Sequence, residues 1–589
     1  MFVLIKLLLF LLSSLGLWEL IYRKTDINLY YLPSITIAIQ VTVLILSGLL
    51  NCLNEFAYMI HVSGLGFLFY FTYKDKNFRC FKKYLNSGYL FMLCSLVFLI
   101  FLLKGKVFLH YDNFSHWAIV LKPMLYENRL PNFTDKIIMF TQYPLGSSVW
   151  VYYFAKFISN KEWIQMLGQN FAIISCILPI FIYCKKNYYI SLIFIFLSTN
   201  IILFYNIEIV DLRVDSLLPI AGMAMLMFIK NYILAERCQA YLAIPLMIWV
   251  LHIKNSGIFF VAIASLIILY QLITCKNYKR FIVMNGLPYF TLFLWQKHCK
   301  YVFENAASSK HAMTFSNYQH VFSNKSVNDI HTIVGNFLDF IFNYNALKEM
   351  LLLLFISGII VYIVDAELKN FAKKIFVINL VMIVTYSLGV LAVYMVSMPI
   401  GEALRLATIE RYVKTILLCS FYTYMVLVVK FLSNVTLKEH KQIISIVSLS
   451  CVLMLFYFNS NTFNKTKPYF YPQDSKHVRI WTEKIINEYK LPKKKSYCFI
   501  VSDSKNDSGY RYYLCKYLLE SKDIVVVQPQ KNGSDDLFMK RLNNIKSQYI
   551  IISDYKNKNI ISWVNKNYPD QKGKNVLLNK KINTGKKIN

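Results

Sequence analysis

The feature that most constrains this chain is the repetition of long apolar runs. Runs of roughly 18 or more apolar residues are long enough to cross the hydrocarbon core of a bilayer. They begin near Phe2, Pro33, Phe56 and Gly88, and further runs follow as far as Phe458. Of the 589 residues, 56% are hydrophobic, far more than a soluble core requires. The sequence therefore predicts a polytopic α-helical membrane protein with about 13–15 spans.

The composition changes abruptly after the last apolar run, which predicts a membrane domain over residues 1–460 and a soluble α/β domain over 461–589. Short β-rich runs alternate with helix-like stretches in the second domain, and this order is typical of a parallel sheet. The predicted strands are Tyr497–Val501, Ile524–Val527 and Tyr549–Ile552, and the predicted helices are Gly509–Leu519, Asp535–Ile545 and Ile560–Asn567. Cys498 and Cys515 either form a disulfide or remain separate thiols.

The net charge of +32 does not indicate nucleic-acid binding, because the basic residues lie mostly in short turns between apolar runs and in the tail. Lipid headgroups and membrane topology account for such a distribution. The first twenty residues carry only Lys6 and Glu19 as charges and precede no small-residue cleavage site, so we expect a retained helix. Most of the twelve cysteines lie in apolar runs without metal-ligand spacing.

The distribution of lysine and arginine predicts which turns face the cytoplasm, because these residues favour the inner side of a membrane. The predicted inner turns are Lys74–Lys83, Cys184–Asn187, Lys230–Arg237, Lys276–Arg280, Lys369–Lys374 and Lys438–Lys441. The predicted outer segments are the loops 104–142 and 298–345 and the turns Asn206–Asp215, His252–Ser256 and Ser397–Arg411. By the same alternation, the soluble domain lies outside the plasma membrane.

The short apolar segment Leu145–Phe157 would break this alternation if it crossed the membrane. It has about a dozen residues, whereas a full span needs roughly twenty. We therefore expect it to lie along the surface or to dip into the membrane and return.

The stretch from His110 to Trp117 concentrates groups that could transfer protons in the first outer loop. Asp112 is the candidate general base, His116 is its candidate catalytic neighbour, and Asn113 is a supporting residue. The alternative is a surface loop whose acidic and histidine side chains face water.

Further charged residues lie at the predicted outer ends of spans, where an ionisable group is costly unless it is paired or lines a wet cavity. Lys122, Lys254, Arg405 and Arg411 are candidate ligands of a donor phosphate. Tyr143, Asp211, Arg213 and Asp215 are candidate supporting or acceptor-binding residues. Each group also has a structural alternative. Arg213 could simply pair with Asp211 or Asp215, and Lys254 could extend toward lipid headgroups. Arg405 and Arg411 could pair with Glu402 and Glu410.

These residues resemble, in order and spacing, the GT-C superfamily of polytopic glycosyltransferases, in the branch that includes protein O-mannosyltransferases and aminoarabinose transferases. The resemblance spans roughly residues 85–300 and rests on the following segments: Tyr111-Asp112-Asn113, Tyr143-Pro144-Leu145, Arg213-Val214-Asp215 and Lys254-Asn255-Ser256-Gly257. Asn113 stands where the mannosyltransferases commonly have a second acid, so no metal cofactor is firmly implied. Three apolar runs also precede the span before the acidic loop, where the family usually has none.

The resemblance implies a GT-C-like bundle and an inverting transfer from a polyprenyl-phosphate sugar donor to a cell-envelope glycan, lipid or protein. Asp112 would be the base, on the extracytoplasmic side. No Gly-rich phosphate loop, HExxH motif or zinc-type CxxC pair indicates another enzyme class. The alternatives are a flippase or transporter of lipid-linked oligosaccharide, a polysaccharide polymerase, and a structural scaffold.

Overall fold

A computed structural model of the chain describes residues 2–76, 78–185, 187–303, 315–434, 474–502, 508–529 and 535–579. The chain forms two compact units. Unit 1 comprises Met1–Val107, Pro123–Asn132 and Phe140–Lys467, and unit 2 comprises Phe108–Lys122, Phe133–Met139 and Pro468–Asn589. The predicted inner turn Lys438–Lys441, the end of the last apolar run near Phe458 and part of the predicted loop 298–345 lie outside the described residues.

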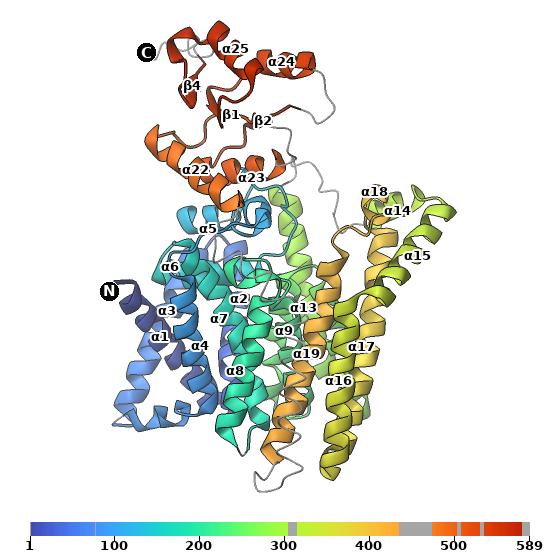
Figure 1. Cartoon of the computed structure of the whole chain (residues 1–589). Coiled ribbons are helices and arrows are strands. Elements are labelled where there is room, and N and C mark those ends of the chain that lie inside the picture. Colours follow the sequence, from blue (N-terminus) through green and yellow to red (C-terminus); the bar gives the residue numbers. More distant parts are fainter. Residues whose placement is uncertain are drawn as a thin grey trace. The chain divides into compact units, whose positions relative to one another are not determined.

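Unit 1 is helical, and its long helices run side by side (Figure 1). Among the described residues, eight helices are long and apolar enough to cross a membrane. They are α1 (Phe2–Thr25), α2 (Leu32–Leu49), α3 (Leu53–Lys74), α7 (Glu162–Ile177, continued by a 3-10 turn to Tyr183), α12 (Gly257–Thr274), α16 (Asn345–Val364), α17 (Lys369–Val396) and α19 (Ile409–Asn434). This confirms a polytopic helical architecture in its coarse form.

The other described α-helices of unit 1 are shorter, except for Tyr278–Val302 with its 25 residues. The apolar ones are α4 (Ser87–Leu103), α8 (Tyr188–Phe204), α9 (Leu217–Tyr232) and α11 (Ala243–Ile253). The others are α5 (Leu121–Glu127), which begins in unit 2, α6 (Gly146–Ile158), α10 (Arg237–Ala240), α13 (Tyr278–Val302), α14 (Phe315–Ser323), α15 (Val327–Asn343) and α18 (Ile400–Ala403). The sequence did not predict α14 and α15, which form part of the loop 298–345.

Contacts within unit 1 join segments that the charge pattern assigns to the same side. The predicted outer segments meet through Lys254 and Asp215 (2.7 Å), Asn336 and Leu404 O (2.9 Å), and Cys299 and Thr141 O (3.5 Å). Two predicted inner turns meet where Arg280 donates to Ala235 O (2.9 Å). Asn187 donates to Leu432 O (2.9 Å), and Gln239, just after another predicted inner turn, donates to Thr25 O (2.8 Å). The alternation of these segments across a membrane stays a prediction.

Helix α6 begins and ends among predicted outer segments. A Cβ added at Gly146 would lie 2.7 Å from His252 O, so the start of α6 touches the Lys254 turn. Near its other end, Lys156 donates to Asn54 (2.7 Å) and to Asn128. That the short segment does not cross the membrane stays a prediction.

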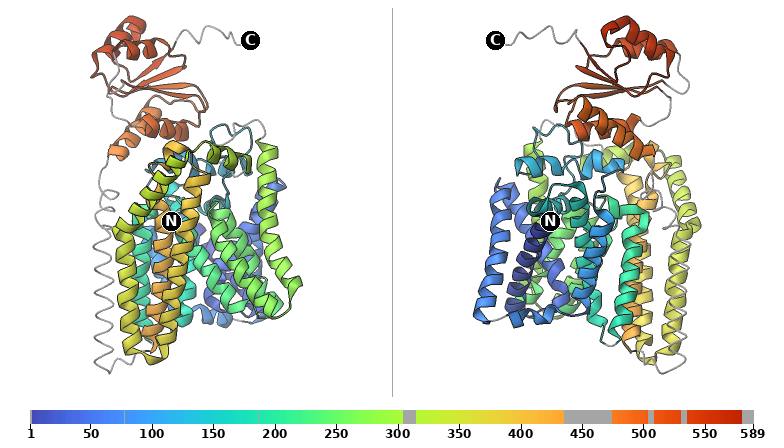
Figure 2. Two further views of the ribbon diagram at one scale, coloured as in Figure 1. Left: turned by 90° about the vertical axis from the view of Figure 1, so that its right-hand side faces the viewer. Right: turned by 60° about the vertical axis from the view of Figure 1, so that its left-hand side comes forward.

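Unit 2 contains a four-stranded sheet in the order β2-β1-β3-β4. The strands β1 (Tyr497–Ile500), β2 (Ile524–Val527) and β3 (Tyr549–Ile552) are parallel, which confirms the predicted sheet. An unpredicted strand, β4 (Val576–Leu578), pairs antiparallel with β3. Helices α22 (Asp474–Glu488) and α23 (Ser508–Leu519) cover one face, and α24 (Asp535–Asn543) and α25 (Lys558–Asn567) cover the other (Figure 2).

Apolar side chains alternate between the two faces of this sheet. Cys498 joins the core beneath α24 and α25, whereas Cys515 belongs to the core on the opposite face. Both are buried free thiols, so the possible disulfide is not formed. The segments Phe108–Lys122 and Phe133–Met139 also belong to unit 2, although the sequence assigned the whole loop 104–142 to the membrane domain.

Candidate functional site

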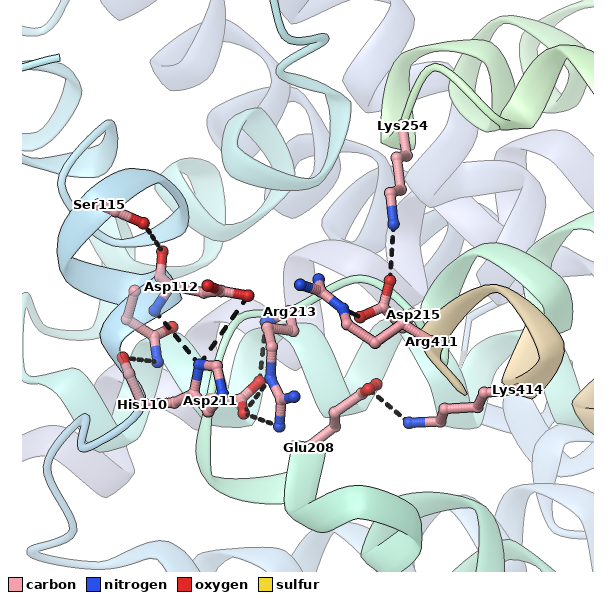
Figure 3. Close-up of polar contacts among 11 residues, drawn as sticks. His110, Asp112, Ser115, Glu208, Asp211, Arg213, Asp215, Lys254, Arg411 and Lys414 are labelled. Atoms are coloured by element: carbon pink, nitrogen blue, oxygen red, sulfur yellow. Dashed lines mark hydrogen bonds and ion pairs between the residues drawn. The ribbon is translucent and has the colours of Figure 1, made fainter. Parts of the chain in front are cut away.

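The candidate site in unit 1 is built around Asp215, which lies just before α9. Its carboxylate contacts Lys254 Nζ at 2.7 Å and Arg411 Nε at 2.8 Å (Figure 3). The Asp215 side chain is 1% exposed, whereas those of Lys254 and Arg411 are 21% and 27% exposed. A buried carboxylate thus orients two cations that remain partly accessible.

A second ion pair, between Glu208 and Lys414, is deeply buried. Glu208 pairs with Lys414 through one carboxylate oxygen, and its other oxygen accepts the Ser216 N–H at 2.7 Å. The two charged side chains are 3% and 1% exposed. Because Ser216 immediately precedes α9, Glu208 also satisfies a backbone donor at the start of that helix, where negative charge is favoured.

Asp211 and Arg213 form the local pair that the sequence left open as a structural alternative. The guanidinium of Arg213 reaches Asp211 at 2.7 and 2.8 Å, and the Arg213 N–H donates to the same carboxylate at 2.8 Å. Gln169 in α7 donates to Arg213 O at 2.6 Å. These contacts fix the backbone that presents Asp215.

The turn carrying Lys254 is held by close backbone approaches. A Cβ added at Gly257 would lie 2.1 Å from Val250 O, so only glycine fits where α12 begins. The contact between Gly146 and His252 fixes the other side of the turn. Tyr143, three residues before Gly146, stacks on Phe140 with ring centroids 5.4 Å apart.

The ion pairs described above join three carboxylates to four cations. We call Glu208, Asp211, Arg213, Asp215, Lys254, Arg411 and Lys414 the outer network. Burial opposes ionisation of Asp215, but the charges of Lys254 and Arg411 outweigh burial and hold its pKa well below the usual value. The carboxylate therefore stays charged at neutral pH.

The candidate base Asp112 lies in unit 2, at the start of a π-helical turn, Asn113–Trp117. It is 7% exposed, which excludes the alternative of a loop side chain simply facing water. The nearest ring nitrogen of His110 lies 3.9 Å from the carboxylate and accepts the Asp112 N–H at 3.2 Å. One ring nitrogen of His110 thus faces both the backbone and the carboxylate of Asp112.

The other predicted residues of this stretch are buried with Asp112. His116 is 3% exposed and packs edge-on against Trp117, with ring centroids 4.5 Å apart. Asn113 is fully buried and donates to His110 O at 3.2 Å. Because Asp112 belongs to unit 2 and the outer network to unit 1, their convergence stays a prediction.

The structure separates the predicted phosphate ligands into three groups. Lys254 and Arg411 join the outer network, whereas Lys122 pairs with Glu520 of unit 2 at 3.4 Å. Arg405 is exposed, and no ion pair joins it to another described residue. Within the described parts of the chain, no group of three His, Cys, Asp or Glu side chains could hold a metal ion.

Sequence reasoning missed two residues that position these sites. Gln169 supports the backbone of Arg213, and Arg479 in α22 donates to Phe108 O next to the Asp112 turn. A polar residue within the apolar run of α7 was the available signal for Gln169. Nothing local marks Arg479, because its partner lies 371 residues away in the sequence.

Comparison of the chain with protein-family models, with curated proteins and with solved structures gives no match.

Proposed function

We propose that the chain is a membrane glycosyltransferase that moves a sugar from a polyprenyl-phosphate carrier to a cell-envelope acceptor on the extracytoplasmic side. The observation that carries the proposal is the arrangement of Lys254 and Arg411 around buried Asp215, with both cations partly exposed. Two partly exposed cations at the ends of apolar helices suit a lipid-linked phosphodiester, which carries one negative charge.

The reaction would be an inverting displacement at the anomeric carbon. The acceptor hydroxyl oxygen forms the new bond to this carbon, while the bond between the carbon and the donor phosphate oxygen breaks. The hydroxyl proton passes to the Asp112 carboxylate, and the bonding electron pair leaves with the phosphate oxygen. Arg411 and Lys254 would stabilise the negative charge that grows on the polyprenyl phosphate.

The proposal is tested by measuring sugar transfer in membrane vesicles supplied with polyprenyl-phosphate sugars. We expect Asp112→Asn to lower transfer by at least about 100-fold, since removal of a general base typically costs two to four orders of magnitude. Asp536→Asn, which changes an exposed carboxylate of α24, is the matched control and should leave transfer unchanged.

Full transfer by Asp112→Asn would remove this residue from the mechanism. Movement of lipid-linked oligosaccharide across liposomes, without any covalent product, would overturn the transferase proposal in favour of a flippase. A product that consists of many joined repeat units would instead identify a polymerase.

A further inference from the structure

The Asp112 turn belongs to unit 2 and packs against its helices. Phe114, two residues after Asp112, is fully buried. Its ring lies 5.2 Å from that of Tyr517 and 5.9 Å from that of Tyr510, both in α23. Tyr111, just before Asp112, approaches Tyr513 of the same helix at 6.1 Å. One face of α23 thus covers the turn on both sides of the carboxylate.

Arg479 in α22 holds the same turn from its beginning. Its guanidinium donates to Phe108 O and lies over the ring of Phe114, 5.6 Å from the ring centre. Glu483, one helical turn away, accepts from this guanidinium at 2.8 Å. The Arg479 side chain is 3% exposed, so these partners must compensate for the cost of burying its positive charge.

The far end of the segment is fixed by Lys122. Its ammonium lies 3.4 Å from Glu520 and 4.2 Å from the centre of the Tyr517 ring. Burial opposes ionisation of Glu520, but Lys493 and Lys122 outweigh it and lower the pKa of this carboxyl below the usual value. The segment 108–122 is therefore held at its start by α22, at its centre by α23 and at its end by Glu520, which directly follows α23.

We infer that helices α22 and α23 of unit 2 position the candidate base, with Arg479 and Phe114 as the positioning residues. The inference rests on the proposed function for its catalytic meaning, whereas the attachment of the turn to α22 and α23 is independent of it. A displacement of a catalytic group by about 1 Å can cost about 100-fold in rate. Loss of either residue should therefore lower turnover without removing any group that touches the substrate.

Hydrogen exchange on the full-length protein in detergent tests the attachment without reference to activity. We expect Arg479→Met to speed exchange of the amides of residues 113–118 by at least about 10-fold, and Arg479→Lys to restore part of the protection. Arg541→Met on α24, across the sheet, is the matched control. Unchanged exchange of the β1 amides shows that the domain remains folded, and Phe114→Ala provides a second variant should Arg479→Met unfold it.

Sugar transfer by the same variants tests the positioning role. We expect kcat to fall about 10-fold or more in Arg479→Met with little change in the donor KM, and Arg479→Lys to recover part of kcat. Unchanged exchange in both Arg479→Met and Phe114→Ala overturns the attachment. Faster exchange with unchanged kcat overturns the positioning role. If the wild-type protein transfers no sugar, the proposed function fails while the exchange result still decides the attachment.

Discussion

Among the described residues of unit 1, two charged clusters, one at each end of the helices, are built differently. The outer network joins Asp215 to Lys254 and Arg411 and joins Glu208 to Lys414, across sequence separations of up to 206 residues. The inner cluster consists of Glu19, Arg23, Asp75, Lys83 and Tyr84, all within one N-terminal stretch. The outer network therefore depends on assembly of the whole bundle, whereas the inner cluster ties α1 to the neighbouring α3–α4 connection.

The clusters also differ in how their cations are exposed. Glu19 is fully buried but faces Arg23 and Lys83, whose side chains are 30% and 24% exposed and can be hydrated. Lys414 and Glu208 have no such access to water, since both are 3% exposed or less. The comparison suggests that the outer pair is structurally critical and that the inner cluster tolerates change.

The largest effect on stability is expected from Lys414→Met, which leaves the buried Glu208 charge without its cation. Breaking a buried pair from one side typically costs about 3–5 kcal/mol of unfolding free energy. Thermal unfolding of the detergent-purified protein measures the loss. The double variant Glu208→Gln with Lys414→Met should recover most of it, because glutamine can still accept the Ser216 N–H. A Lys414→Met protein as stable as the wild type would contradict this role.

A smaller loss is expected from Glu19→Gln in the inner cluster. Glutamine can still accept from Tyr84, and Arg23 keeps its ion pair with Asp75. We expect a loss of about 1.5–3 kcal/mol in the same unfolding measurement, typical of a hydrogen bond to a charged group. A loss as large as that of Lys414→Met would erase the proposed difference between the clusters.

The smallest effect on stability is expected from Arg411→Gln. Asp215 retains Lys254, and the Arg411 side chain is 27% exposed, so water can replace part of the interaction. We expect a loss of about 1 kcal/mol or less. A substantially larger loss would show that Arg411 is primarily a structural residue rather than one available to a ligand.

Helices and strands that show as runs of neighbouring residues could be predicted from the sequence. Short β-branched runs gave β1, β2 and β3, and long apolar runs gave the helices of unit 1, because both patterns follow from burial of neighbouring residues. The amphipathic helix α22 and strand β4 lacked so clear a pattern. The candidate site was recovered in part: Asp215, Lys254 and Arg411 were identified as charged groups, but their mutual pairing depends on tertiary folding. The attachment of the Asp112 turn to α22 and α23 could not be predicted, because its partners lie in another part of the chain.

Binding of polyprenyl phosphate to the detergent-purified protein is the most direct test of the outer network, since it requires no knowledge of the sugar or acceptor. Arg411 and Arg405 lie in the same segment, but only Arg411 contacts Asp215, so they form a matched pair. We expect Arg411→Gln to weaken binding at least about 10-fold, the effect of losing one charge-assisted contact, and Arg405→Gln to leave it unchanged. Equal affinity of the wild-type protein and Arg411→Gln would contradict the assignment of this network to a lipid-linked phosphate.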